Sequence, residues 1–288
     1  MIIDLQIHST CSDGYLSPTE VANFLAREGV KIASLTDHNT TAGYPEFYTA
    51  CSRLGIKVVP GIEIYTRVNN QQINILWYNL PLDSPEFNEL MKNTQRHWLA
   101  RLRWHLLKLV EAKVLVAGSE AVLDQFSNYV PTNGLLDAIL SLPGNREIIA
   151  KELNSPFFRE EDAIALLFNN KKVGKLRPST INLEKVVNLK KKLGGQLVFC
   201  HPAKGRVVTA KLVAQLKSLG VEGLEVLSPH HSLGAIFYLQ DLAERNDMII
   251  TAGSDFHRFE GGSHGLTSVY DYWQADSSHL RRIEEIIG

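Results

Sequence analysis

Histidine and carboxylate side chains follow the β-prone runs of this sequence in a repeated way. The residues are His8, Asp13, His38, Glu63, His201, Asp255 and His257. Imidazole nitrogens bind Zn, Mn or Fe, and carboxylates can bridge two such ions. Residues two apart, such as Asp255 and His257, point the same way from an extended segment. One histidine at a strand end is usually a hydrogen-bonding loop residue, but seven such residues at successive strand ends predict a multinuclear metal site.

Strands that alternate with helices must position these side chains. The β-prone runs span residues 1–7, 30–35, 56–59, 72–78, 196–200, 221–227 and 248–252. A first helix is predicted after Ser17, because this N-cap serine is followed by Pro18 and by Glu20 of a capping box. Further helices are predicted over 45–54, 212–219, 234–244 and 277–287. Repeated strand–helix units predict parallel strands, whose carboxyl ends form the active-site face in α/β barrels.

The middle of the chain, residues 83–180, lacks this alternation. Leucines recur there at three- and four-residue spacing (Leu99, Leu102, Leu106 and Leu109), which predicts a long helix. A shorter helical pattern occupies 146–168, and a basic segment follows at 171–177. We therefore expect an α/β domain built from 1–82 and 181–288, with 83–180 inserted as a mainly helical cap.

Composition limits the classes of function. The 288 residues include 30 Lys and Arg against 31 Asp and Glu, so the net charge of −1 gives no surface for coating a polyanion. Cys11, Cys51 and Cys200 are odd in number and lack CxxC spacing, which argues against a disulfide framework and a zinc finger. No apolar run reaches about 18 residues, and the first residues lack a signal-peptide pattern. We expect a cytoplasmic enzyme with neither a membrane segment nor an obligate protein partner.

Five short segments carry a family resemblance. Residues 4–14, DLQIHSTCSDG, resemble the opening motif of the PHP (polymerase and histidinol phosphatase) superfamily. Four later segments resemble the later motifs of this superfamily in the same order. They are LTDHNTT at 35–41, PGIEI at 60–64, CHP at 200–202 and GSDFH at 253–257. The resemblance covers nearly all of 1–82 and 185–270. The helical insert, with Arg96 and the segment 172–178, is similar to that of the subgroup containing RNase AM and 3′,5′-nucleoside bisphosphate phosphatases.

The resemblance implies a distorted (β/α)7 barrel with two or three divalent ions (Mn, Zn or Fe, possibly Mg). Such proteins hydrolyse phosphate esters of nucleotides or short RNA through a metal-bound hydroxide. Carried over by motif, one ion is held by Gln6, His8, Glu63 and Asp255, a second by Asp13, His38 and His257, and a third by Glu63, Asn74 and His201. Catalysis would depend on Asp13, His38 and His257, with Asp37 orienting a neighbouring histidine.

Two of these positions depart from the family pattern. Gln6 and Asn74 stand where the family has histidine. An amide oxygen can bind Mg²⁺ or Mn²⁺ but is a poor zinc ligand. The sequence is therefore compatible with an esterase of altered metal preference, with a reduced site of weak or different activity, and with a protein that binds nucleotides or RNA ends without hydrolysis.

Phosphate contacts are expected from basic and imidazole side chains. The candidates are Arg96, Lys172, Lys204, His230 and His231, with His264 as a further loop histidine. A binding protein without hydrolysis would add Arg101, Arg103, Lys175, Arg177 and Arg206. For Arg101 and Arg103 we favour a solvated helix face.

Overall fold

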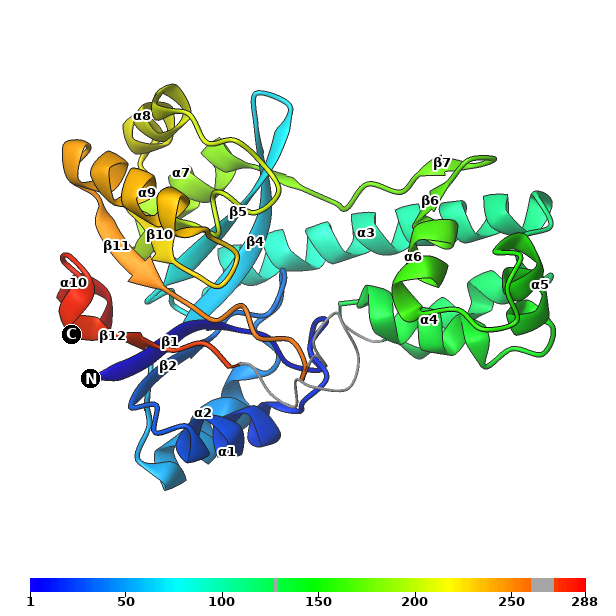
Figure 1. Ribbon diagram of the computed structural model, residues 1–288, viewed down its shortest axis with the longest axis horizontal. Coiled ribbons are helices and arrows are strands. Elements are labelled where there is room, and N and C mark those ends of the chain that lie inside the picture. Colours follow the sequence, from blue (N-terminus) through cyan, green and yellow to red (C-terminus); the bar gives the residue numbers. More distant parts are fainter. Residues whose placement is uncertain (127–128, 260–271) are drawn as a thin grey trace. The chain divides into compact units, whose positions relative to one another are not determined.

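The computed structural model describes residues 1–126, 129–259 and 272–288 (Figure 1). The chain forms two compact units, the first made of Met1–Glu89 with Thr180–Gly288 and the second of Leu90–Ser179. Within the described ranges, no helix is both long and apolar enough to cross a bilayer.

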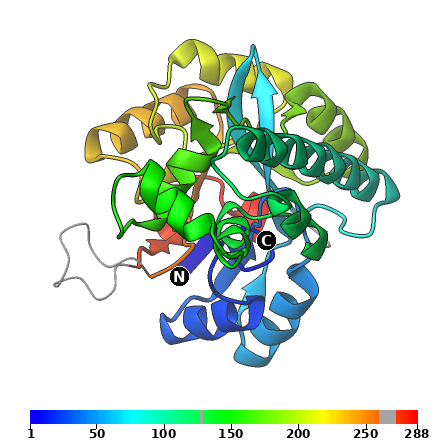
Figure 2. The ribbon, with the colours of Figure 1, turned by 90° about the vertical axis from the view of Figure 1, so that its right-hand side faces the viewer.

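A four-stranded sheet in the first unit has the order β12-β1-β2-β3. Its strands are β1 (Ile2–Ile7), β2 (Ile32–Leu35), β3 (Lys57–Val58) and β12 (Ala275–Asp276). The first three are parallel, and β12 is antiparallel to β1. Helices α1 (Pro18–Arg27) and α2 (Tyr44–Leu54) connect the parallel strands and lie beside each other (Figure 2). The predicted capping box of α1 is present, with Ser17 and Glu20 each accepting a backbone N–H.

The other large sheet has the order β11-β10-β9-β5-β4-β8. Its strands are β4 (Gly61–Val68), β5 (Gln71–Tyr78), β8 (Ile181–Asn182), β9 (Gln196–Phe199), β10 (Gly223–Leu227) and β11 (Ile249–Ala252). Not every strand follows the predicted parallel order, because β5 is antiparallel to both β4 and β9. Asn69 and Asn70 explain the reversal. Both have positive φ, as a two-residue hairpin turn requires, and such a turn returns the chain antiparallel.

Helices α7 (Leu183–Leu193), α8 (Ala210–Leu219) and α9 (Leu233–Arg245) alternate with the strands of this sheet. The predicted helix over 277–287 is wrong. Its place is taken by the short 3₁₀ helix η2 (Ser277–His279) and by α10 (Glu284–Ile287), with Arg282 in a left-handed conformation between them. The two large sheets meet through single bridges that join Ile7 to Phe256 and His38 to Glu63. The first unit is thus an α/β fold with two mixed sheets, and closure into a seven-stranded barrel stays a prediction.

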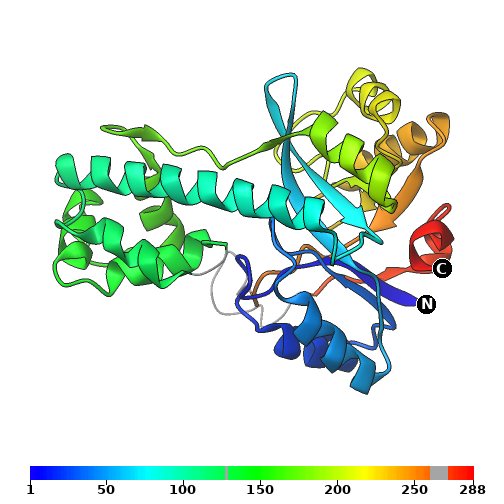
Figure 3. The same cartoon turned by 180° about the vertical axis from the view of Figure 1, so that it is seen from behind.

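The second unit is mainly helical (Figure 3). It contains most of α3 (Pro85–Glu111), then η1 (Ser119–Gln125), α4 (Thr132–Leu140), α5 (Asn145–Glu152), α6 (Glu160–Phe168) and the short pair β6 (Asn169–Asn170) and β7 (Gly174–Lys175). The predicted long helix is α3, and Leu102, Leu106 and Leu109 are buried. Nε2 of His105, on α3, lies 2.8 Å from the carbonyl oxygen of Leu167 and joins α3 to the end of α6.

Candidate metal centre

The seven histidines and carboxylates predicted to share a site all belong to the first unit and do meet there. His8 follows β1, His38 follows β2, and His201 follows β9, while Asp255 and His257 follow β11. Glu63 differs from expectation, because it lies within β4 and not after a strand. Pro60 lacks an N–H to continue the strand pairing of β3, and the chain begins a new strand at Gly61.

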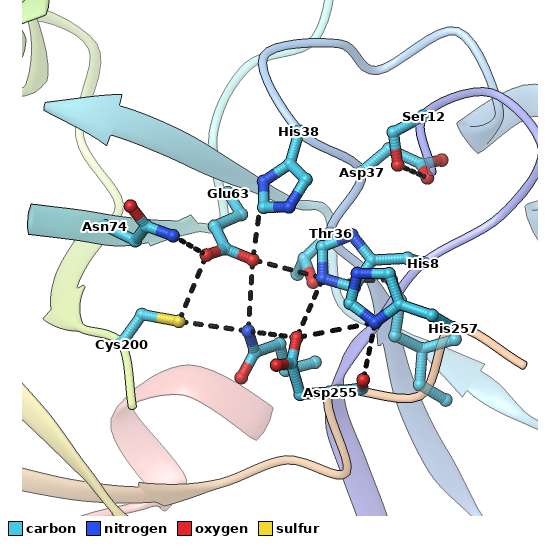
Figure 4. Close-up of polar contacts among 12 residues, drawn as sticks. His8, Ser12, Thr36, Asp37, His38, Glu63, Asn74, Cys200, Asp255 and His257 are labelled. Atoms are coloured by element: carbon cyan, nitrogen blue, oxygen red, sulfur yellow. Dashed lines mark hydrogen bonds and ion pairs between the residues drawn. The ribbon is translucent and has the colours of Figure 1, made fainter. Parts of the chain in front are cut away.

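The ligand atoms form three overlapping groups, each within 4.8 Å. The groups are His8, Asp13, His38 and His257; His8, Glu63 and Asp255; and Glu63, Cys200 and His201. His8 belongs to two groups, and so does Glu63. The centre is therefore one connected cluster of donor atoms (Figure 4).

Asp13 is the centre of the first group. Its carboxylate oxygens lie 3.2 Å from Nε2 of His257, 3.4 Å from Nε2 of His38 and 3.6 Å from Nδ1 of His8. The three rings stand close together, with 4.1 Å between the ring centres of His8 and His257. The ring of Tyr65 stacks on that of His38, with 4.3 Å between the ring centres.

Glu63 joins the other two groups through its two carboxylate oxygens. Oε2 lies 3.1 Å from Nε2 of His8 and 3.7 Å from Nδ1 of His38. Oε1 lies 3.2 Å from Nε2 of His201 and 3.4 Å from Sγ of Cys200. Glu63 is completely buried. Its carboxylate lies between the two groups and contacts residues of both.

The electrostatics pair ionised carboxylates with imidazoles. Burial alone would raise the pKa values of Asp13, Glu63 and Asp255, but the surrounding histidines lower all three well below the usual range. Burial would lower the pKa of His8, but the carboxylates of Asp255 and Glu63 raise it well above its usual value. When no metal ion is bound, the positively charged imidazoles and the carboxylates stabilise each other.

Several buried polar atoms in the cluster make no contact with hydrogen-bond geometry among the described residues, although the ring nitrogens of His8 and Nδ1 of His38 lie 3.1–3.7 Å from carboxylate oxygens. They are Nδ1 and Nε2 of His8, Nδ1 of His38, Nδ1 of His201 and Oε1 of Gln6. Buried polar atoms are normally hydrogen-bonded, so an orphaned set demands an explanation. Imidazole nitrogens beside buried carboxylates are the donors that divalent transition metals prefer. The residues present therefore fit divalent ions.

Gln6 and Asn74 both lie in the cluster and present their amide nitrogens to it. Nε2 of Gln6 lies 3.0 Å from Oε2 of Glu63, Sγ of Cys200 and Oδ1 of Asp255. Nδ2 of Asn74 donates to Oε1 of Glu63 at 2.6 Å. The orientation of a side-chain amide is assigned from its hydrogen-bond surroundings. When no metal ion is bound, neighbouring carboxylates favour the orientation that turns the amide N–H toward them.

Asp37 does not orient a histidine as expected. Its carboxylate accepts hydrogen bonds from the backbone N–H and hydroxyl of Ser9 and from the hydroxyl of Ser12, at 2.6–2.7 Å. No other side-chain hydrogen bond of Asp37 occurs among the described residues. This buried carboxylate therefore fixes the loop that carries Asp13.

The expected substrate-contacting residues divide into three cases. Nε2 of His230 and Nζ of Lys204 lie 2.7 and 2.6 Å from Oδ2 of Asp255, at the exposed edge of the cluster. Both ring nitrogens of His231 bond the main chain, at the Val226 carbonyl and the Ala203 N–H, so this buried ring is structural. Arg96 and Lys172 belong to the second unit, where Arg96 donates to Asn93 and Lys172 pairs with Glu152. His264 lies outside the described residues.

Sequence reasoning missed three residues of the site: Tyr65, Cys200 and Glu225. Glu225 is a completely buried carboxyl in β10, and Oε2 accepts the backbone N–H of His201 at 2.6 Å. Burial and nearby carboxylates raise the pKa of Glu225 well above its usual value. A glutamate within an apolar strand was a readable signal of a special environment. Cys200 offered only its position next to His201, and Tyr65 offered none.

The sequence profile of the PHP domain matches residues 4–164, more than half of the chain. The protein therefore belongs to the PHP family, as the motifs indicated. A phosphoribosyl 1,2-cyclic phosphate 1,2-diphosphodiesterase from Eggerthella lenta is 29% identical over 260 residues, which cover 89% of this chain and 94% of that protein. A 3′,5′-nucleoside bisphosphate phosphatase from Chromobacterium violaceum is 27% identical over 271 residues, which cover 90% of this chain and 89% of that protein.

A solved structure shows the same fold. It is that of an amidohydrolase from Chromobacterium violaceum with bound sulfate and no metal, and it superposes with a TM-score of 0.70 at 25% sequence identity. The alignment covers 93% of this chain and 91% of the other.

Proposed function

We propose that this protein is a divalent-metal-dependent hydrolase of phosphate esters. The observation that carries the proposal is the cluster of three overlapping donor groups that share His8 and Glu63, with orphaned imidazole nitrogens among ionised carboxylates. We assign one ion to Gln6, His8, Glu63 and Asp255, a second to Asp13, His38 and His257, and a third to Glu63, Asn74 and His201. Ions bound there would neutralise charge on the phosphoryl and leaving oxygens and activate water.

The substrate approaches from the edge formed by the site's more exposed side chains. Side-chain exposure is 26% for Asp13, 27% for His257, 31% for His230 and 43% for Lys204, whereas His8 and Glu63 are completely buried. The ammonium of Lys204 has three N–H donors, of which Asp255 takes one. The remaining donors, together with the ring of His230, would bind phosphoryl oxygens.

The substrates we propose are nucleotides with a terminal phosphate and short RNA. The bisphosphate phosphatase and the cyclic-phosphate diesterase are both named for reactions at phosphate esters. We further propose that residues 1–82 and 181–288 close as a distorted (β/α)7 barrel and that 83–180 acts as a cap whose Arg96 and Lys172 bind substrate phosphates. The family match supports the inclusion of the insert, because the profile extends to residue 164 and so covers Arg96.

The test is hydrolysis by metal-stripped protein reloaded with Mn²⁺, Zn²⁺ or Fe²⁺. Adenosine 3′,5′-bisphosphate and a 5′-phosphorylated RNA oligomer serve as substrates. We expect metal-dependent phosphate or nucleotide release that His257→Ala abolishes and that His279→Ala, an exposed histidine, leaves unchanged. Binding of both substrates without turnover under every metal would refute hydrolysis and support the nucleotide-binding alternative.

A further inference from the structure

Cys200 lies among the polar side chains of the centre, whereas the other buried cysteine has an apolar environment. Sγ of Cys200 is 3.0 Å from Nε2 of Gln6 and 3.4 Å from Oε1 of Glu63. Cys51 is equally buried but packs in the hydrophobic cluster of α1, α2 and β1. Free cysteines are commonly buried as small apolar residues, which explains Cys51. That explanation does not apply to a sulfur surrounded by a carboxylate, an amide and an imidazole.

The two distances from Oε1 of Glu63, to Cys200 and to His201, match those between neighbouring ligand atoms around one tetrahedral ion, and the three donor atoms all lie within 4.8 Å of one another. Zinc bonds of about 2.0 Å to N and O and about 2.3 Å to S place neighbouring ligand atoms about 3.3 Å (N to O) and about 3.5 Å (O to S) apart. The observed distances from Oε1 of Glu63 are 3.2 Å to Nε2 of His201 and 3.4 Å to Sγ of Cys200.

Strand register explains how position 200 can supply this donor. Ile75 pairs with Phe199 across the antiparallel β5–β9 ladder, and the backbone N–H of Cys200 donates to the carbonyl of Asn74. Directly opposed residues place their side chains on the same face, about 5 Å apart. Cys200 therefore reaches the place that Asn74 faces, where Asn74 presents its amide N–H to Glu63.

The surroundings of this group hold more hydrogen-bond acceptors than N–H protons. Oε1 of Gln6 is buried without a hydrogen-bond partner in the described chain. Nε2 of Gln6 has two protons but three acceptors at 3.0 Å, so it cannot satisfy the sulfur and both carboxylates together. An ion bound to these acceptors would remove the deficit.

We infer that Cys200 is a thiolate ligand that makes the Glu63–Cys200–His201 position selective for a zinc-like ion. The inference rests on the proposed metal dependence of the same centre. Thiolate ligands select soft and borderline ions, whereas carboxylate and amide oxygens suit Mg²⁺ and Mn²⁺. The ion displaces the thiol proton when it binds. The group of His8, Asp13, His38 and His257 contains no sulfur, so the two ends of the centre would differ in metal preference.

The experiment follows Co²⁺ titrated into metal-stripped protein, because cobalt bound by a thiolate shows a sulfur-to-metal absorption in the near ultraviolet. We expect this band in wild type and in the control Cys51→Ala, and its loss in Cys200→Ser and Cys200→Ala. Chelator competition should show zinc affinity falling at least about tenfold in Cys200→Ser, with manganese affinity almost unchanged. Absence of the band in wild type, or its survival in Cys200→Ser, would overturn the inference.

A measurement on wild type alone covers the case in which both Cys200 variants misfold. X-ray absorption at the zinc edge should show a sulfur neighbour at about 2.3 Å, and a shell of N and O only would refute ligation by Cys200. These readouts are independent of turnover. A sulfur ligand without ester hydrolysis leaves Cys200 assigned and refutes the proposed function, whereas hydrolysis without a sulfur ligand does the reverse.

Discussion

Nε2 of His8 lies 3.1 Å from Oε2 of Glu63, with both side chains completely buried and without the geometry of a hydrogen bond. Two ionisable groups at this distance attract strongly in a site without solvent. Because the other oxygen of Glu63 faces His201 and Cys200, this one carboxylate couples the ends of the centre. The predictions below begin from that coupling.

Glu63→Gln should remove at least one bound ion. The amide keeps the size of the side chain but loses the charge shared by two of the donor groups. We expect the metal content to fall by at least one ion per chain. Turnover should fall at least about 100-fold, which is more than the loss of a residue that only hydrogen-bonds to a metal ligand would cause. Elemental analysis and initial rates measure both. Glu184→Gln, at an exposed position on α7, is the control, and full metal content in Glu63→Gln would contradict the assignment.

Metal removal should lower the thermal stability of the protein. A ligand that binds only the folded state at 100 times its Kd adds about 2.7 kcal/mol, which is several degrees in Tm for a chain of this length. We expect chelation to lower Tm and added Zn²⁺ or Mn²⁺ to restore it. Scanning calorimetry with and without metal provides the measurement. A Tm that does not respond to metal in wild type would argue that the cluster binds no ion.

Asp37→Asn should disorder the loop that carries Asp13. An amide nitrogen cannot accept a hydrogen bond, so at least one donor of Ser9 or Ser12 would lose its acceptor in a buried position. We expect a loss of about 1–3 kcal/mol in the free energy of unfolding, together with weaker metal binding at the Asp13 group. Urea unfolding and metal titration separate the two effects. If Asp37 acted on a histidine instead, Ser9→Ala with Ser12→Ala would leave metal affinity unchanged.

His231 should make the fold sensitive to acid without contributing to turnover. Burial lowers the pKa of His231 below its usual value of about 6.5, so the unfolded chain takes up the proton first. The stability contributed by the neutral ring is present above pH 6.5 and is lost as the pH falls through the folded-state pKa. In metal-free protein, the difference in unfolding free energy between wild type and His231→Gln should shrink below pH 6.5. A pH-independent difference, or a large rise in KM, would contradict a structural role.

Local sequence patterns predicted the features that depend only on residues close together in the chain, such as helix caps and buried helix faces. The capping box of Ser17 and Glu20 and the buried leucines of α3 require only their own helices. The hairpin at Asn69 and Asn70 was missed because the strand–helix rhythm outweighed a two-residue turn signal. The helix predicted at 146–168 divides into α5 and α6, with Asn154 in a left-handed conformation between them.

The sequence predicted which histidines and carboxylates belong to the candidate site, but it did not predict their contacts or the other residues around them. Histidines and carboxylates after strands could be read from the sequence, and they do cluster. The place of Cys200 depends on the register of β5 against β9, which no local pattern encodes. The role of His231 depends on backbone groups at Val226 and Ala203, from two separate segments. Long-range pairing therefore decided which neighbours of the motifs belong to the centre.

Restoring histidine at both altered positions tests whether Gln6 and Asn74 weaken the centre or adapt it. If they weaken it, Gln6→His with Asn74→His should raise metal occupancy and phosphoesterase turnover, because an imidazole is a stronger donor than an amide for transition metals. The two positions contact different oxygens of Glu63, so the double change should exceed the sum of the single changes. All four proteins are compared for metal content and for hydrolysis of adenosine 3′,5′-bisphosphate and 5′-phosphorylated RNA. His257→Ala in each background is the control and should abolish activity, because it removes the imidazole whose Nε2 lies 3.2 Å from the carboxylate of Asp13. If wild type hydrolyses these substrates efficiently and the double variant is slower, Gln6 and Asn74 belong to an active site with altered metal ligands.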